Sequence, residues 1–266
     1  MFEKVNPSHP DKIADRIAGA LVDRAYAIKD DPKIAVEVLI GHNQCTIISE
    51  ADVRFTDDEV KNIIKRISGQ DVKLLLIQNN QDSHLADNQK TLSCGDNGIF
   101  KGAVVSEEEK YLTNLAGQLY SKYPYDGKYL IDGQKVTICQ SHADNINLYD
   151  KDRIFVINPL GYWTGGIDVD CGATNRKLGS DLGRGVTGGG IHGKDLSKAD
   201  VTLNIYNHLK AQATGNDIEL SCSIGDKTVA GFDYQYYVSF VKRYISSIGG
   251  FEKLAEWGLI RPEIKL

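Results

Sequence analysis

The feature that most constrains the fold is a glycine-rich, charged stretch at residues 188–195, which reads GGGIHGKD. Glycines let backbone N–H groups approach an anion closely, and Lys194 and Lys198 add positive charge beside them. The carboxylate of Asp200 is a hard oxygen ligand suited to a divalent cation next to the same anion. This combination predicts a site for a polyphosphate carried with Mg²⁺.

The same stretch excludes the fold that its spacing first suggests. Residues 188–194 satisfy the GxxxxGK part of a Walker A loop, which follows an apolar strand and continues with Ser or Thr. Here Asp195 takes the Ser or Thr position, and residues 180–187 are polar and glycine-rich instead of apolar. We therefore predict phosphate binding without a P-loop NTPase fold.

Composition narrows the class of protein. The 266 residues are 41% hydrophobic and 25% charged, as in ordinary globular proteins, and the net charge of −5 argues against a nucleic-acid partner. Five cysteines without a CxxC pair indicate reduced thiols instead of a disulfide framework or a zinc site. No apolar run reaches the length of a membrane span and no signal peptide is evident, so we predict a cytoplasmic protein without a membrane partner.

Hydrophobic periodicity and capping signals predict helices and strands along the whole chain. The predicted helices cover residues 10–28, 56–67, 106–120, 196–211, 236–245 and 251–257, and the predicted strands cover 33–40, 44–49, 71–78, 128–131, 135–140, 153–158 and 218–224. Mixed sheets covered by helices define an α+β class, with a structural repeat in three parts. We place the three subdomains at residues 1–78, 91–160 and 161–266.

Several short segments combine residue types that suit anion chemistry. The run from His9 to Lys12 lies at a predicted helix N-terminus, where anions are favoured, although by itself the run is better explained by Asp11 complementing the helix dipole. Residues 126–128 form either a simple turn or part of a ligand-binding site. Residues 165–177 form either a solvated loop or part of such a site. Trp163 either packs in the core or stacks on a purine.

Five of these segments, in order, resemble the signatures of the S-adenosylmethionine synthetase (methionine adenosyltransferase) family. Residues 9–15 resemble GHPDKIxDQ, 93–99 resemble GAGDQG and its neighbour, 155–161 resemble FxINPxG, 170–177 resemble DxGLTGRK, and 188–200 resemble GGGAFSGKDxxKVD. The resemblance extends from residue 9 to residue 200, and the last third agrees more loosely.

The resemblance implies three similar α/β subdomains with pseudo-threefold symmetry. It also implies a homodimer or a dimer of dimers, with active sites between subunits. The implied reaction joins the sulfur of L-methionine to C5′ of ATP, and the displaced triphosphate is then hydrolysed to pyrophosphate and phosphate. The alternatives are a non-catalytic nucleotide-binding member that regulates a partner synthetase, or a (poly)phosphate hydrolase.

The resemblance also assigns roles to individual residues. The triphosphate would be bound by His9, Lys128, Arg176, Lys177 and Lys194, and the rest of ATP by Asp126, Trp163, Asp170 and Ile191. Methionine would be bound by Glu50, Asp170, Lys198 and either Gln78 or Gln81. Magnesium, expected as two ions, would be held by Asp11 and Asp200 with Asp96 nearby, and K⁺ by Glu37.

The chain departs from the family pattern in four places. It is shorter than typical members, and the glycine-rich loop at residues 188–195 is one residue shorter than the family loop. Tyr162 and Trp163 replace an RF pair, and Asn175 replaces the glycine of TGRK. Residues 79–89, where the family keeps its active-site gate, are polar and almost devoid of apolar side chains, which predicts a mobile lid.

Overall fold

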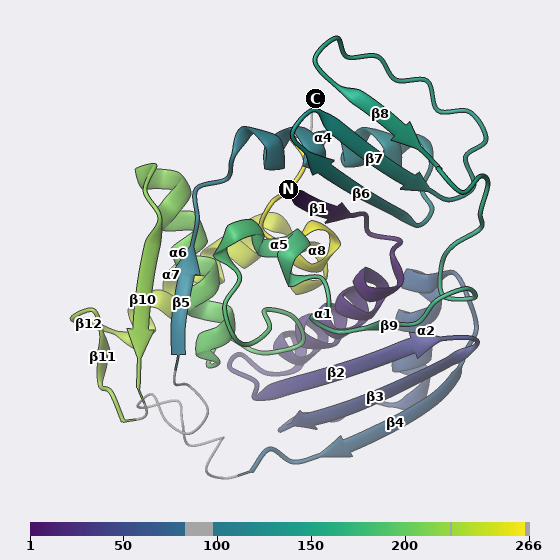
Figure 1. Cartoon of the computed structure of the whole chain (residues 1–266). Helices are drawn as coiled ribbons and strands as arrows, with labels where there is room; N and C mark the ends of the chain where they lie inside the picture. Colours follow the sequence, from purple (N-terminus) through teal and green to yellow (C-terminus); the bar gives the residue numbers. More distant parts are fainter. Residues whose placement is uncertain (83–97, 224, 264–266) are drawn as a thin grey trace.

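The computed structural model describes residues 1–82, 98–223 and 225–263. In chain order (Figure 1), its helices and strands are β1 (Phe2–Val5), α1 (Pro10–Ile28), β2 (Ile34–Gly41), β3 (Gln44–Ala51), α2 (Asp57–Ser68), β4 (Lys73–Asn79), β5 (Gly98–Gly102), α4 (Glu107–Lys122), β6 (Gly127–Asp132), β7 (Lys135–Gln140), β8 (Ile154–Ile157), β9 (Gly172–Ala173), α5 (Leu178–Leu182), a 3₁₀ turn at Gly183–Gly185, α6 (Ala199–Thr214), β10 (Ile218–Cys222), β11 (Thr228–Val229), β12 (Phe232–Asp233), α7 (Tyr234–Ile248) and α8 (Phe251–Trp257). This mixture of helices with mixed sheets confirms the predicted α+β class.

The first sheet has the strand order β4-β3-β2-β9. Strands β2 and β3 form the predicted antiparallel hairpin, whereas β4 runs parallel to β3 because α2 carries the chain back across the sheet. Helices α1 and α2 cover one face of this sheet, and no helix of the described residues lies on the other face (Figure 1).

Two further sheets are assembled from strands that lie far apart in the sequence. The N-terminal strand β1 pairs with β6 in the sheet β1-β6-β7-β8, and β5 pairs with β10 at the side of the molecule occupied by α6 and α7 (Figure 1). Each sheet has its own cluster of buried apolar side chains. Because strands from different predicted subdomains pair with one another, as β1 does with β6, β2 with β9 and β5 with β10, the three subdomains remain a prediction.

Local signals explain where the long helices begin and end. Helix α1 starts at Pro10 with His9 as its N-cap, and both predicted capping boxes are present, at Thr56 with Glu59 and at Ser106 with Glu109. Helix α6 begins three residues later than predicted, at Ala199. The delay arises because the Asp195 carboxylate binds the backbone N–H groups of residues 34 and 197, which holds this segment in an irregular turn.

Several short elements of the structure were not predicted from the sequence. Strands β1, β5 and β9 and helix α5 contain two to five residues each, too few for a periodic pattern. Strand β9 presses against the start of α1, since a Cβ on Gly172 would lie 1.9 Å from the carbonyl oxygen of Pro10. This contact brings the segment at residues 170–177 to the N-terminus of α1. Among the described helices, none is both long and apolar enough to cross a membrane.

Strand β5 touches α6 so closely that a side chain cannot fit between them. A Cβ on Gly102 would lie 2.1 Å from the backbone carbonyl carbon of Asn207, whereas a Cβ on Gly179 would meet nothing within 4 Å. We expect Gly102→Ala to lower the free energy of unfolding by about 3 kcal/mol, because overpacking must displace backbone. Urea denaturation measures this, with Gly179→Ala as the matched control; equal stabilities of the two variants would contradict the packing described.

Candidate active site

The centre of the site is the N-terminus of α1. The backbone N–H of Asp11 donates to His9 Nδ1 over 3.2 Å, and Asp11 Oδ1 accepts from the backbone N–H of Ala173 over 2.9 Å. Both side chains are buried. Since Nδ1 of His9 accepts a hydrogen bond, the ring proton of a neutral His9 resides on Nε2, from which it can be donated to an anion.

The four cations that were predicted to bind one anion each pair with a carboxylate of the protein, and two of them pair with Asp11. Arg176 Nε lies 3.6 Å from Asp11 Oδ1, and Lys177 Nζ lies 3.4 Å from Asp11 Oδ2. Glu3 joins the third, because its carboxylate oxygens lie 2.9 Å from Lys128 Nζ and 3.9 Å from Lys177 Nζ. The fourth cation, Lys194, pairs with a different carboxylate, described below.

Glu3 is a site residue that the sequence analysis missed. It lies on β1 diagonally across from Lys128, because Val5 is the direct partner of Lys128 in the register. No motif contains it, and only the pairing of β1 with β6 brings it to the site.

Burial keeps His9 uncharged. Desolvation lowers the pKa of His9 from 6.5 to about 4, and the positive charges of Lys177 and Lys128 act in the same direction against the opposing effect of Asp11. At neutral pH the imidazole is therefore a neutral hydrogen-bond donor beside several cations.

The glycine-rich loop at residues 188–195 brings Lys194 and Asp200 together. Lys194 Nζ lies 3.0 Å from Asp200 Oδ2. Gly189 has a φ of +78°, and a Cβ there would lie 2.2 Å from Cγ of Asp200. Only glycine therefore leaves room for this carboxylate, whose oxygens are hard ligands of the kind that Mg²⁺ prefers.

Asn175 connects this loop to the segment that carries Arg176 and Lys177. Its side chain donates to the backbone oxygen of His192 over 3.2 Å and accepts from the His192 N–H over 3.0 Å. Its φ of +62° lies in the left-handed region, which asparagine tolerates and which explains how it replaces a family glycine. From the sequence alone, Asn175 was recognised only as a departure from the family motif.

Asp126 and Trp163 lie side by side at the edge of the second sheet, because a Cβ on Gly165 would touch both. Asp126 Oδ2 accepts from the backbone N–H of Gly166 over 2.9 Å, while buried Oδ1 has no partner within the described part of the chain. Burial raises the pKa of Asp126 to about 6, and the negative charges of Asp170 and Asp11 add to this effect. The unpaired oxygen is suited to accept from a ligand hydroxyl or amino group.

Trp163 also lines a cavity of about 340 Å³ whose other lining residues are Cys139, Asn158, Pro159, Leu160 and Gly161. Its walls are mostly apolar and include an indole ring, which suits the flat face of a purine.

Two predicted ligands, Glu37 and Glu50, lie on the open face of the first sheet, away from the start of α1. A Glu37 carboxylate oxygen accepts from the Thr174 hydroxyl, which links this face to the Arg176 segment. Glu50 is opposite Ala35 in the β2–β3 register, and Ala35 forms a bridge with Lys194. Lys198 is the N-cap residue of α6, two residues before Asp200.

The remaining predicted residues differ in whether their side chains are free to contact a ligand. The side-chain amide of Gln78 is fully engaged with the backbone of Phe55, because its oxygen accepts from the Phe55 N–H and its nitrogen donates to the Phe55 carbonyl oxygen. In contrast, Oε1 of Gln81 is buried and unpaired among the described residues. Ile191 is fully buried in the core, which leaves only its backbone to face a nucleotide. Asp96 and residues 83–89 of the predicted lid lie outside the described residues.

A buried group of Asp15, Asp181 and His192 has the composition of a metal site, since one ligand atom from each lies within 4.8 Å of the others. However, Lys12 Nζ lies 2.7 Å from Asp181, 3.1 Å from Asp15 and 3.4 Å from His192 Nε2. The ammonium group therefore fills the position of a cation, and these four residues form a charged cluster instead of a metal centre.

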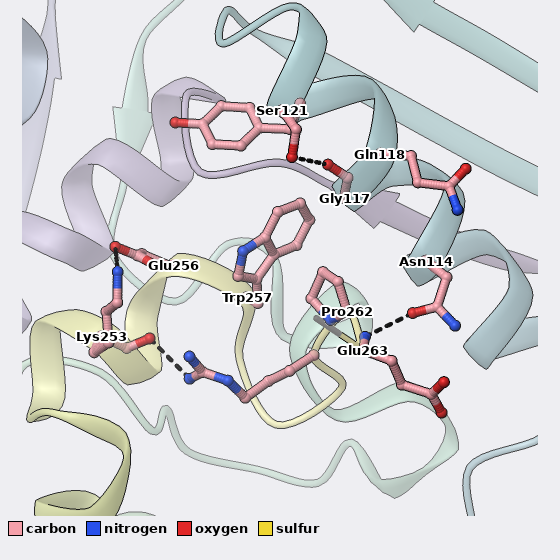
Figure 2. A pocket seen from close by; sticks show the side chains of 11 residues that line it. Asn114, Gly117, Gln118, Ser121, Lys253, Glu256, Trp257, Pro262 and Glu263 are labelled. Atoms are coloured by element: carbon pink, nitrogen blue, oxygen red, sulfur yellow. Dashed lines mark hydrogen bonds and ion pairs between the residues drawn. The ribbon is translucent and has the colours of Figure 1, made fainter. Parts of the chain in front are cut away.

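A cavity of about 570 Å³ lies elsewhere, between α4, α8 and the residues after α8. Figure 2 shows Trp257 and Pro262 projecting into it between Asn114 on one side and Lys253 on the other. None of the predicted site residues lines it, so volume alone does not mark the chemistry in this protein.

Comparisons with known proteins agree with the motifs. The profile of the S-adenosylmethionine synthetase N-terminal domain matches residues 1–89. The S-adenosylmethionine synthase of Borreliella afzelii is 27% identical over 91% of this chain and 83% of its own length, and that of Azobacteroides pseudotrichonymphae is 25% identical over 98% and 82%.

The fold agrees as well. An S-adenosylmethionine synthetase from Campylobacter jejuni, described as unusual, superposes with a TM-score of 0.75 over 97% of this chain and 94% of its own, at 19% sequence identity. At that identity the likeness shows the fold alone.

The electrostatic surroundings of His9 predict how it titrates. We expect its imidazole to titrate near pH 4, because burial and two lysines disfavour the imidazolium ion. Tripolyphosphate should raise the pKa of His9, because an adjacent anion favours the charged ring. His208, buried on α6 with a pKa also lowered to about 4, should not respond. Side-chain NMR measures both rings; a His9 pKa near 6.5, or equal shifts of both, would contradict the site.

Proposed function

We propose that this chain, which belongs to the S-adenosylmethionine synthetase family, makes S-adenosylmethionine from ATP and L-methionine. The observation that supports this proposal is the grouping of His9, Lys128, Arg176 and Lys177 around Asp11 and Glu3, together with the pairing of Lys194 in the glycine-rich loop with Asp200 at the start of α6. Such a grouping provides several fixed cations for one polyphosphate.

In the proposed reaction the sulfur of methionine attacks C5′ of ATP and the whole triphosphate leaves. A thioether is a weak neutral nucleophile, so positioning and stabilisation of the leaving group must supply most of the acceleration. Arg176, Lys177, Lys128 and Lys194 would neutralise the departing triphosphate, and His9 Nε2–H would donate to one of its oxygens. Bound triphosphate would then be hydrolysed at the same cations.

The nucleoside would extend from this cluster toward Asp126 and Trp163. The unpaired Asp126 oxygen would accept from the nucleoside, and the cavity beside Trp163 would hold the adenine ring. We assign methionine to Asp170, Glu50 and Lys198, together with Gln81 in preference to Gln78, because the Gln78 amide is already engaged with Phe55. Charged groups of both signs match the carboxylate and ammonium of an amino acid.

The residues present fit the expected metal ions. The carboxylates of Asp200 and Asp11 would hold Mg²⁺, which when bound neutralises phosphate charge. Glu37, fixed by the Thr174 hydroxyl, would hold K⁺.

We also infer a homodimer formed by the open face of the first sheet. Four apolar side chains on this face are at least 39% exposed, namely Leu39, Ile48, Leu75 and Ile77. Glu37 and Glu50 lie among them, because Glu37 faces Ile48 and Ile48 faces Ile77 across the strands. A second subunit would cover the apolar side chains and bring its own residues to the site, as active sites between subunits require.

The compartment follows from cysteine chemistry. Among the described cysteines, Cys45, Cys139 and Cys171 are free thiols. Reduced thiols of this kind are typical of the cytosol, and we place the protein there.

The experiment that tests the function is incubation of the protein with ATP, L-methionine, Mg²⁺ and K⁺, followed by assays of S-adenosylmethionine, pyrophosphate and phosphate. All three products in equal amounts would support the synthetase. Phosphate without S-adenosylmethionine would favour a (poly)phosphate hydrolase, and nucleotide binding without any product would favour a non-catalytic regulator of another synthetase.

Lys194 should matter chiefly for charge that develops on the triphosphate. We expect Lys194→Ala to lower kcat by roughly 10²–10³, the scale for losing a preorganised electrostatic donor. Lys210→Ala, which removes an exposed lysine from the other end of α6, serves as the control and should leave kcat unchanged. A Lys194→Ala enzyme with normal turnover would remove this residue from the mechanism.

The open sheet face predicts the consequence of placing charge on it. The double variant Ile48→Asp/Leu75→Asp should be monomeric and inactive, because buried carboxylates at an interface would be unpaired. Ile154→Asp changes an equally exposed apolar residue on β8 and should remain dimeric. Sedimentation velocity measures the assembly; a monomeric wild type with full activity would overturn the dimer.

A further inference from the structure

The charged cluster of Lys12, Asp15, Asp181 and His192 has a role that the proposed reaction does not account for. We propose that His192 is a positioning residue: through Asp181 and Lys12 it fixes the glycine-rich loop against the two other segments that carry triphosphate-binding residues. This inference rests on the proposed function only for the meaning of those segments, since the contacts themselves are independent of it.

The cluster is sealed from solvent and fully hydrogen-bonded around the ammonium group. Lys12 Nζ donates to both oxygens of Asp181, over 2.7 and 2.9 Å, and to Asp15 Oδ2 over 3.1 Å. His192 Nε2 lies 2.8 Å from Asp181 Oδ2. Because an ionised carboxylate only accepts hydrogen bonds, Nε2 of His192 carries the proton and donates it to Asp181.

The members of the cluster come from three parts of the site. Lys12 follows Asp11 directly in α1. Asp181 lies on α5, and its backbone N–H donates to the carbonyl oxygen of Lys177. His192 precedes Lys194 by two residues in the glycine-rich loop. One carboxylate, that of Asp181, therefore joins three segments that come together only in the folded chain.

The backbone and the side chain of His192 are held separately. The side chain of Asn175 binds the backbone of His192 by two hydrogen bonds. Asp15 in turn accepts from the backbone N–H of Asn175 over 2.7 Å. The bond from the imidazole to Asp181 is the link that fixes how far the loop lies from α5. Without it, the loop keeps its bonds to Asn175 and its backbone pairing with β2 through Gly193 and Asp195, but it loses its side-chain link to Asp181.

Two substitutions separate positioning from general stability. His192→Phe removes the donor with similar volume and should lower kcat about 10–100-fold, the scale for losing an outer-shell partner, with little change in KM for methionine. His192→Gln retains an N–H donor and should restore most of the rate. The matched control is His208→Phe, which removes another buried histidine from outside the cluster and should leave kcat unchanged.

Hydrogen exchange gives a readout that needs no catalysis. In His192→Phe the amides of residues 188–195 should exchange faster than in the wild type, while His208→Phe should leave them unchanged. If the wild type makes no S-adenosylmethionine, the proposed function fails, yet faster loop exchange still supports the positioning role.

Two results would overturn the inference. One is unchanged loop exchange in His192→Phe. The other is a loss of rate that His208→Phe reproduces or that His192→Gln does not restore, since a merely structural role would give that pattern.

Discussion

The site depends on one buried ion pair, between Lys12 and Asp181. Both side chains are completely inaccessible to solvent, and their atoms approach to 2.7 Å. Burial alone would lower the pKa of Lys12, but Asp181 and Asp15 outweigh it and raise that pKa; burial alone would raise the pKa of Asp181, but Lys12 and His192 hold it below its usual range. Loss of either partner would leave an uncompensated buried charge, which typically costs about 3–5 kcal/mol.

A second buried lysine, Lys4, connects distant segments of the chain close to this pair. Lys4 on β1 donates to the backbone oxygens of Ser180, Trp257 and Ile260 over 2.6–2.8 Å. Burial lowers its pKa to about 7, so three carbonyl groups stabilise a charge that has little access to water. The residues after α8 are thereby joined to β1 and to the start of α5, next to Asp181.

The cations of the site are held apart by carboxylates of the protein itself. Glu3 lies between Lys128 and Lys177, and Asp200 pairs with Lys194. Like charges that converge on one ligand repel one another, and these acids offset that repulsion in the ligand-free chain. A bound triphosphate would take over this role with a larger charge, which explains why a protein of net charge −5 can present a cationic site.

The sequence by itself determined the long elements and the chemistry of the motifs. Helix α1, the β2–β3 hairpin and both capping boxes follow from residues within a few positions of one another, and five motifs resemble those of the S-adenosylmethionine synthetase family. The tertiary structure decided what depends on distant residues: the pairing of β1 with β6, the roles of Glu3 and Asn175, and the engagement of Gln78 with Phe55. Lys12 and Asp181 are 169 residues apart, and no local pattern encodes such a contact, because only the packed core brings the two charges together and excludes water from them.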